Sequence, residues 1–291
     1  MAASPERIIN AGFEILAKNI ELSLVEYTSV RRCQADIEAY LGKYITTFTT
    51  ELPGAFARKT MVAPLKGSVV DMLVLFNEKH SSTFLPDDLL GKLHVTLLAK
   101  YPGTTFDKLS ESVFVPVEDF RFRVQPGFLT EKNHFLTPGP SWNEWVEYDS
   151  LGYASEFSKE NARHGGKLLN LVRMIKTWNR LSGNAFDGYF LELLIRDVIN
   201  SYEIVTYQEA INYVFKSILA DVALKKHDPA NQSLQVEGLH DLESIVNEMI
   251  HVKSSYLVTQ EAIKNEEEQD VKSALLNWGQ LFPGHFPKLK S

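Results

Sequence analysis

The chain has a single cysteine, no excess of basic residues and no long apolar segment, and each absence excludes a class of protein. With Cys33 alone among 291 residues, an internal disulfide is excluded and a reducing, cytoplasmic environment is expected. The 37 acidic residues outnumber the 30 basic ones, and the net charge of −7 argues against nucleic acid as a partner. No apolar run approaches the roughly 20 residues that cross a bilayer, so we expect no membrane partner.

A secretory signal and a metal-binding motif are missing as well. The N-terminus, MAASPERIIN, lacks a basic segment followed by an apolar core, so we expect no export. The eight histidines are not spaced as metal ligands, and no metal site is predicted from them. A hydrophobic content of 44% is ordinary, and the sequence therefore predicts one large or two closely packed globular domains.

The N-terminal half mixes helical and strand patterns. Residues 4–45 are expected to be mostly helical, with Ser4 as the N-cap and Pro5 at the first helical position. Residues 129–160 contain several prolines, glycines and aromatic residues and predict an irregular connection. The other elements expected in this half are strands at 69–76, 112–116 and 120–126 and a helix at 86–100.

From about residue 161 the pattern is helical. Thr206 and Glu209 form a capping box at a helix start, and Asp228-Pro229 breaks the chain. The expected helices cover 168–182, a segment from about Phe186 to Leu194, a segment after Thr206, 239–251 and 255–279.

Residues 52–76 carry the most informative local pattern. A tight turn, Pro53-Gly54-Ala55, leads into Arg58-Lys59-Thr60, and a strand then carries Asp71. Because successive strand side chains alternate between faces, position 69 shares a face with Asp71. That position is a valine, which cannot bind a metal ion.

This segment resembles the active site of the CD-NTase family, the bacterial relatives of cyclic GMP-AMP synthase that make cyclic oligonucleotide signals. Family members have Gly-Ser, then Ala-Arg-Gly-Thr, then two aspartates one residue apart. Here the corresponding residues are Gly54-Ala55 and Val69-Val70-Asp71. The second half is also similar, at Arg173-Met174-Ile175-Lys176-Thr177-Trp178-Asn179, Phe190-Leu191-Glu192, Asp228-Pro229 and the closing Trp278…Phe286-Pro287. The resemblance covers roughly residues 25–287.

The resemblance implies an α+β fold in two parts. Residues 1–155 would form an N-terminal bracing helix and a nucleotidyltransferase (polymerase beta-like) core with a mixed sheet. Residues 156–291 would form a helical C-terminal lobe.

The resemblance also implies that the metal site is lost. Family members hold two magnesium ions with three carboxylates, because two-metal catalysis needs several converging oxygens. Val69 and Arg123 stand at two of those positions, so Asp71 alone remains. Arg123 could pair with Asp71 in the space that the metals used, or it could be solvated and unpaired.

The nucleotide-binding residues implied by the resemblance are Gly54, Ala55, Arg58 and Lys176. The backbone amides of Gly54 and Ala55 persist although the family's serine is absent. Lys176 shares a helix face with Arg173 and Arg180, which indicates either a phosphate site or a solvated stripe.

Three functions remain open. The first is a catalytically inactive CD-NTase-like protein, a pseudoenzyme in bacterial antiphage defence. It would need no cofactor and would bind a nucleotide, a cyclic oligonucleotide or a defence-system protein. The alternative is an active cyclic-oligonucleotide synthase that uses Asp71 with Glu118 or Asp119 and needs magnesium and nucleoside triphosphates. The third is an interaction module that binds no nucleotide.

Overall fold

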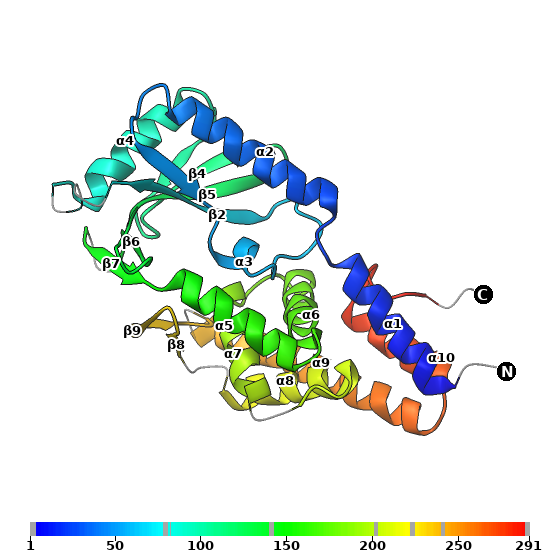
Figure 1. Cartoon of the computed structure of the whole chain (residues 1–291). Coiled ribbons are helices and arrows are strands. Elements are labelled where there is room, and N and C mark those ends of the chain that lie inside the picture. Colours follow the sequence, from blue (N-terminus) through cyan, green and yellow to red (C-terminus); the bar gives the residue numbers. More distant parts are fainter. Residues whose placement is uncertain are drawn as a thin grey trace. The chain divides into compact units, whose positions relative to one another are not determined.

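The computed structural model describes residues 4–77, 81, 83–139, 143–200, 203–221, 225–239 and 242–288. The chain divides into two compact units (Figure 1). The sheet unit consists of Leu22–Ser158 and Pro229–Asn231, and the helical unit of Met1–Glu21, Lys159–Asp228 and Gln232–Ser291. The division predicted after residue 155 is close to the one at Ser158, but the structure groups the first helix with the helical unit.

The sheet unit is built on a mixed sheet. Its central strands, β2 and β5, are parallel, and the other neighbours are antiparallel in the order β1-β2-β5-β4-β3, with β6 beside β5 and β7 beside β6. The strands are β1 (Phe48–Glu51), β2 (Val69–Phe76), β3 (Thr105–Asp107), β4 (Ser112–Val117), β5 (Phe120–Leu129), β6 (Phe135–Pro138) and β7 (Trp145–Tyr148). The helices are α2 (Leu24–Leu41), α3 (Gly54–Ala57), α4 (Pro86–Leu98) and α5 (Ser150–Arg163), which continues into the helical unit.

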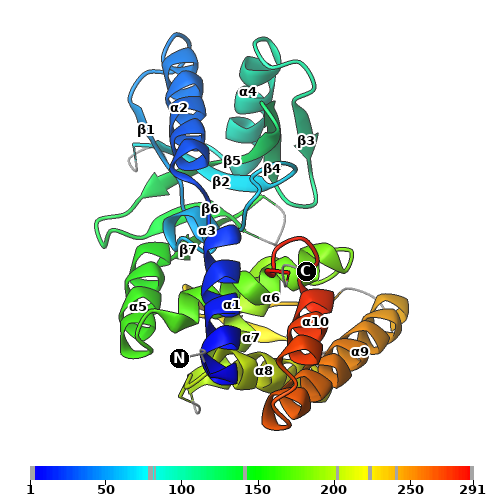
Figure 2. The same ribbon diagram turned by 90° about the vertical axis from the view of Figure 1, so that its right-hand side faces the viewer.

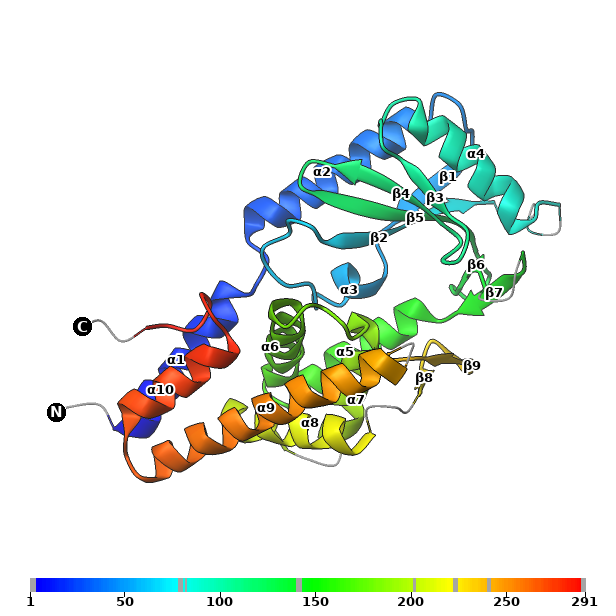
Figure 3. The same ribbon diagram turned by 180° about the vertical axis from the view of Figure 1, so that it is seen from behind.

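One face of this sheet forms the core of the unit. Val70, Met72 and Val74 of β2 and Phe122 and Val124 of β5 point to the same face and are buried against α2 and α4. Figure 1 shows these two helices on one side of the sheet. Burying each such side chain contributes about 1.5–3 kcal/mol, so this face fixes the strand positions. The alternate residues, Asp71 among them, are directed to the opposite face, where α3 lies (Figure 3).

Most elements predicted for this unit are confirmed. The strand at 69–76 is β2, the strands at 112–116 and 120–126 are β4 and β5, and the helix at 86–100 is α4. The irregular connection predicted for 129–160 is wrong, because β6, β7 and the start of α5 lie there; its residues 140–142 lie outside the described part. Strands of four residues are too short to show a period beside prolines and glycines.

The helical unit contains α1 (Pro5–Asn19), α6 (Lys167–Leu181), α7 (Gly188–Asn200), α8 (Tyr207–Asp221), β8 (Lys226–Asp228), β9 (Asn231–Val236), α9 (Leu242–Glu267) and α10 (Val271–Leu281). Ser4 caps α1 as predicted, since its side chain accepts a hydrogen bond from the Arg7 amide. Figure 2 shows α1 beside α10. Phe13 of α1 meets the rings of Trp278 and Phe286 edge to face, at centroid distances of 5.0 and 5.2 Å. This aromatic cluster holds the first helix in the helical unit.

The predicted helices at 239–251 and 255–279 are placed wrongly. One continuous helix, α9, runs to Glu267, and the break comes at Asp270, whose side chain caps α10. Within α9, the hydroxyl of Ser255 accepts a hydrogen bond from the buried indole of Trp178 at 2.8 Å. Thr206 caps α8 as predicted, with its Oγ1 accepting from the Glu209 amide at 3.3 Å and donating to Glu209 Oε2 at 3.2 Å.

The mixed sheet with flanking helices and the separate helical unit confirm the α+β class. In the described ranges, no helix is both long and apolar enough to cross a bilayer.

Candidate functional site

The parallel pairing of β2 with β5 brings the candidate residues of the sheet unit together. Asp71 is in register with Arg123, and Val69 is in register with Arg121. All four point to the face opposite the core, because they alternate with the buried residues of the two strands. The burial of alternate residues from Phe120 to Gln125 agrees with the strand predicted for 120–126.

Asp71 and Arg123 form an ion pair. Both Nε and Nη2 of Arg123 lie 2.7 Å from Oδ1 of Asp71. The side chain of Asp71 is 26% exposed and that of Arg123 is 43% exposed, so the pair is open to solvent. Of the two possibilities for Arg123, the structure has the paired one.

Gly54 covers the other side of the Asp71 carboxylate. The residue has a φ of +67°, and a Cβ added to it would lie 2.4 Å from Oδ2 of Asp71. Glycine is therefore required both by the backbone conformation and by the close approach. The turn begins the short helix α3, in which Ala55 follows directly.

Arg58 follows α3 and belongs to the same unit. Its guanidinium lies over the ring of Tyr153, 5.0 Å from the centroid. This contact orients the cation by stacking on an aromatic face.

These residues do not fit a two-metal centre. Oδ1 of Asp71 is engaged by Arg123, Oδ2 lies against Gly54, and the neighbouring position on the strand is Val69. Within the described part of the chain, no group of three or more His, Cys, Asp or Glu side chains could hold a metal ion. A divalent cation beside Asp71 would also meet the fixed positive charge of Arg123.

Glu118, which an active synthase would use together with Asp71, points toward α2 and not toward Asp71. It lies in the β4–β5 turn and accepts hydrogen bonds from Ser29 and Arg32 of α2, which covers the opposite face of the sheet. The hydrogen bond from Ser29 is the main cause that lowers the pKa of Glu118, and Arg32 adds to it. Asp119 accepts the Gly67 amide through its backbone carbonyl at 2.7 Å. Glu118 therefore does not join Asp71.

Lys176 lies on α6 in the helical unit, where it pairs with Glu192 of α7. Its Nζ is 2.7 Å from Glu192 Oε1, and the side chains are 12% and 0% exposed. Arg173 on the same helix is also buried and pairs with Glu21 at 3.2 Å. A solvated stripe is therefore wrong for Arg173 and Lys176. Sequence reasoning missed Glu192 as a partner, although a single acidic residue within the apolar run Phe190–Ile195 was a usable signal.

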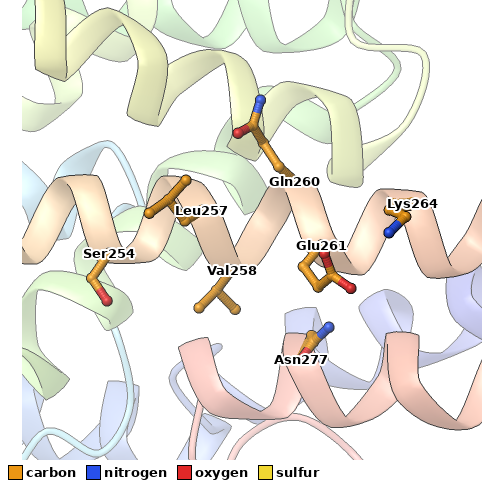
Figure 4. Close-up of a pocket in the computed structure, with 7 residues that line it drawn as sticks. All are labelled: Ser254, Leu257, Val258, Gln260, Glu261, Lys264 and Asn277. Atoms are coloured by element: carbon orange, nitrogen blue, oxygen red, sulfur yellow. The ribbon is translucent and has the colours of Figure 1, made fainter.

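A surface pocket lies between α9 and α10 of the helical unit (Figure 4). It is lined by apolar Leu257 and Val258 and by polar side chains that include Glu261, Lys264 and Asn277. Glu261 and Lys264 are solvent-exposed charges, and the lining shows no pattern of a reactive site.

Residues 8–161, more than half of the chain, match the Second Messenger Oligonucleotide or Dinucleotide Synthetase (SMODS) domain. A "Probable cyclic nucleotide synthase" of Bacillus cereus (strain VD146) is 20% identical over 285 residues, covering 85% of this chain and 83% of the relative.

Solved structures share the fold over nearly the whole chain. CdnC of E. coli MS115-1 with ATP has a TM-score of 0.71 at 15% identity, covering 96% of this chain and 98% of CdnC. The same protein in complex with HORMA-deltaN has a TM-score of 0.69, also at 15% identity and with the same coverage. The Vibrio cholerae DncV cyclic AMP-GMP synthase with a linear intermediate has a TM-score of 0.66 at 12% identity, covering 96% of this chain and 87% of DncV. At these identities the similarity shows the fold alone.

Proposed function

Because the chain belongs to the SMODS family of CD-NTases, with their nucleotidyltransferase fold, we propose that it is a catalytically inactive member that binds a nucleotide or cyclic oligonucleotide. The proposal places it in the bacterial cytoplasm and in antiphage defence. The single cysteine supports the cytoplasmic part.

The observation that carries the proposal is the ion pair between Arg123 and Asp71. Transfer of a nucleotidyl group by two metals requires carboxylates that neutralise and bridge both ions. Here the remaining carboxylate is engaged by a guanidinium at 2.7 Å, and the position two residues earlier is Val69. The nucleotidyltransferase fold is therefore present without the carboxylates at positions 69 and 123 that a two-metal centre requires.

Binding is supported by the turn that persists beside this pair. Gly54 keeps its left-handed conformation, and the amides of Gly54 and Ala55 and the side chain of Arg58 are the proposed nucleotide contacts of the sheet unit. Lys176 of the helical unit, which pairs with Glu192, is a proposed contact on the family resemblance alone. The similar CdnC has been solved both with ATP and with a HORMA protein. A protein partner from the same defence system is therefore part of the proposal.

The first test is a synthesis assay. The purified protein is incubated with the four α-labelled ribonucleoside triphosphates and magnesium or manganese, and phosphatase-resistant products are separated by thin-layer chromatography. We expect no product, while the Vibrio cholerae cyclic AMP-GMP synthase assayed in parallel forms one. A labelled cyclic product from this chain would overturn the inactive assignment.

A designed metal site tests the structural reason. Replacing both Val69→Asp and Arg123→Asp puts three carboxylates on one sheet face and removes the cation that is paired with Asp71. We expect the double variant to bind magnesium in calorimetry and the wild-type protein not to. If the double variant does not bind magnesium, the assignment of these positions to the family's metal site is wrong.

A further inference from the structure

Two arginines of β5 lie on the sheet face that carries Asp71. Arg121 is in register with Val69 and Arg123 with Asp71, so this strand pair presents two guanidinium groups and one carboxylate. Both arginines reach solvent, since Arg121 is exposed and Arg123 retains 43% of its side-chain exposure. These three side chains carry one more positive than negative charge.

Both guanidinium groups are oriented by neighbours within the sheet unit. Arg123 is held by Asp71 through Nε and Nη2, and Arg121 lies over the ring of Phe114, 4.9 Å from its centroid. Pre-oriented side chains lose less conformational entropy when a ligand binds. Arg121 extends toward β4 and Arg123 toward β2, so the two guanidinium groups flank β5 on one face of the sheet, where a chain of phosphates lying across the strand can meet both.

A divalent cation has the opposite preference at this place. Oδ1 of Asp71 already accepts from Arg123, and Oδ2 lies against the Gly54 backbone. Magnesium demands near-ideal oxygen geometry and loses its water reluctantly, so it gains little from one engaged carboxylate beside a fixed cation.

Resting on the proposed function, we propose that this face binds the phosphate groups of its ligand without a divalent cation, with Arg121 and Arg123 supplying the positive charge. Arg123, which stands at one of the family's metal-ligand positions, thus supplies the positive charge that metal ions supply in a two-metal site.

The consequence is a reversed response to magnesium. In a two-metal site the cation brings the polyphosphate to the protein. Here magnesium complexes the polyphosphate charge in solution and competes with the two arginines for it. Affinity is therefore highest in the presence of a chelator and falls as magnesium is added.

The test uses isothermal titration calorimetry with inorganic tripolyphosphate, which has no base and so does not depend on base specificity. Titrations in EDTA and in excess magnesium are compared. We expect binding in EDTA and weaker binding in magnesium. Arg121→Ala and Arg123→Ala are each expected to weaken binding in EDTA by roughly 10- to 100-fold, as for lost hydrogen bonds to a charged group.

The matched control is Arg32→Ala in the same unit. Arg32 pairs with Glu118 on the side of α2, so we expect its replacement to leave the affinity for tripolyphosphate unchanged. Arg123→Lys keeps the charge but loses the planar fork, and we expect an intermediate affinity. Circular dichroism melting shows that each variant is folded before it is titrated.

The outcomes separate this inference from the proposed function. Binding that requires magnesium, or binding in EDTA that survives both arginine substitutions, overturns the inference and leaves nucleotide binding in place. No binding of tripolyphosphate or of any of the four ribonucleoside triphosphates, in either buffer, overturns nucleotide binding itself.

Discussion

The two ion pairs of the candidate residues have the same length and differ in burial. Asp71–Arg123 and Lys176–Glu192 both measure 2.7 Å, but the first pair is 26% and 43% exposed and the second is 0% exposed at Glu192. An exposed pair contributes at most about 1 kcal/mol, whereas breaking a buried one costs about 3–5 kcal/mol. At equal length, burial thus distinguishes the two pairs. Asp71–Arg123 can be reached by a ligand, whereas Lys176–Glu192 holds α6 and α7 together.

The largest effect is expected for Lys176→Ala. It leaves the buried carboxylate of Glu192 without its ammonium partner, and we expect a loss of about 3–5 kcal/mol in the free energy of unfolding, measured by urea denaturation. Lys264→Ala is the control, because its contact with Glu268 is 4.0 Å long and both side chains are 60% exposed; a change within about 0.5 kcal/mol is expected. If the two variants lose the same stability, the distinction by burial is wrong.

Replacing both partners sharpens the same point. The double variant Lys176→Met with Glu192→Leu removes both charges and is expected to recover most of the stability lost in Lys176→Ala. It also separates a structural role of Lys176 from nucleotide binding, which stays a prediction for this residue.

The second effect concerns the turn over the exposed pair. Gly54→Ala combines a backbone φ of +67° with a Cβ placed 2.4 Å from Asp71 Oδ2, and we expect a loss of about 1–3 kcal/mol. Gly91→Ala is the matched control, because Gly91 lies in α4 with no atom within 4 Å of an added Cβ. It is expected to stabilise the protein by about 0.5–1 kcal/mol. Thermal unfolding of both variants measures the contrast.

A smaller effect is expected for Arg123→Ala. Since this pair is open to solvent, the loss in the free energy of unfolding should stay below about 1 kcal/mol. The difference between the urea midpoints of this variant and of Lys176→Ala measures how much more stability the buried ion pair contributes than the exposed one. A loss as large as that of Lys176→Ala would make Arg123 a structural residue and weaken its proposed role toward a ligand.

The smallest effect is a pH dependence in the helical unit. Burial raises the pKa of Glu266, whose Oε1 accepts the indole hydrogen of Trp278 at 2.6 Å. An acid whose pKa is raised in the folded state contributes its full stability below the unfolded pKa of about 4 and loses it as the pH rises through the folded pKa. Glu266→Gln should therefore gain stability relative to the wild type as the pH rises above about 4. Glu268→Gln, in the exposed turn directly after α9, should show no such trend in urea titrations across pH.

The sequence predicted the strands that carry the site because each has a recognisable pattern. β5 alternates apolar and polar residues from Phe120 to Gln125, β2 is an apolar run that contains Asp71, and the family resemblance put Arg123 at a metal-ligand position. Strand register is a tertiary property, so the residues alone could not have paired these two positions. The close approach of Gly54 to Asp71 could not be predicted either, because it depends on the tertiary packing of α3 against β2.

The helical unit was predicted less well in its charges and helix ends. Arg173, Lys176 and Arg180 share a face by helical spacing, but spacing cannot show that Glu21 and Glu192 pair with two of them. The helix end predicted at 251 is wrong, because α9 continues from Leu242 to Glu267. This part of α9 is packed within the helical unit, with Val252 buried and Ser255 bonded to Trp178, and such tertiary contacts cannot be read from local sequence.

The parallel pairing of β2 with β5 also bears on how the site assembles during folding. β4 and β5 are joined by a tight turn, whereas β2 meets β5 only after the chain from Asn77 to Asp119 has been placed between them. Local hairpins form quickly and long-range parallel pairs form slowly. In a long-range pair, the chain loses the entropy of closing a long loop before the new contacts stabilise it. We therefore expect Arg123 to enter a hairpin before Asp71 reaches it, and the site to be completed late, when β2 pairs with β5.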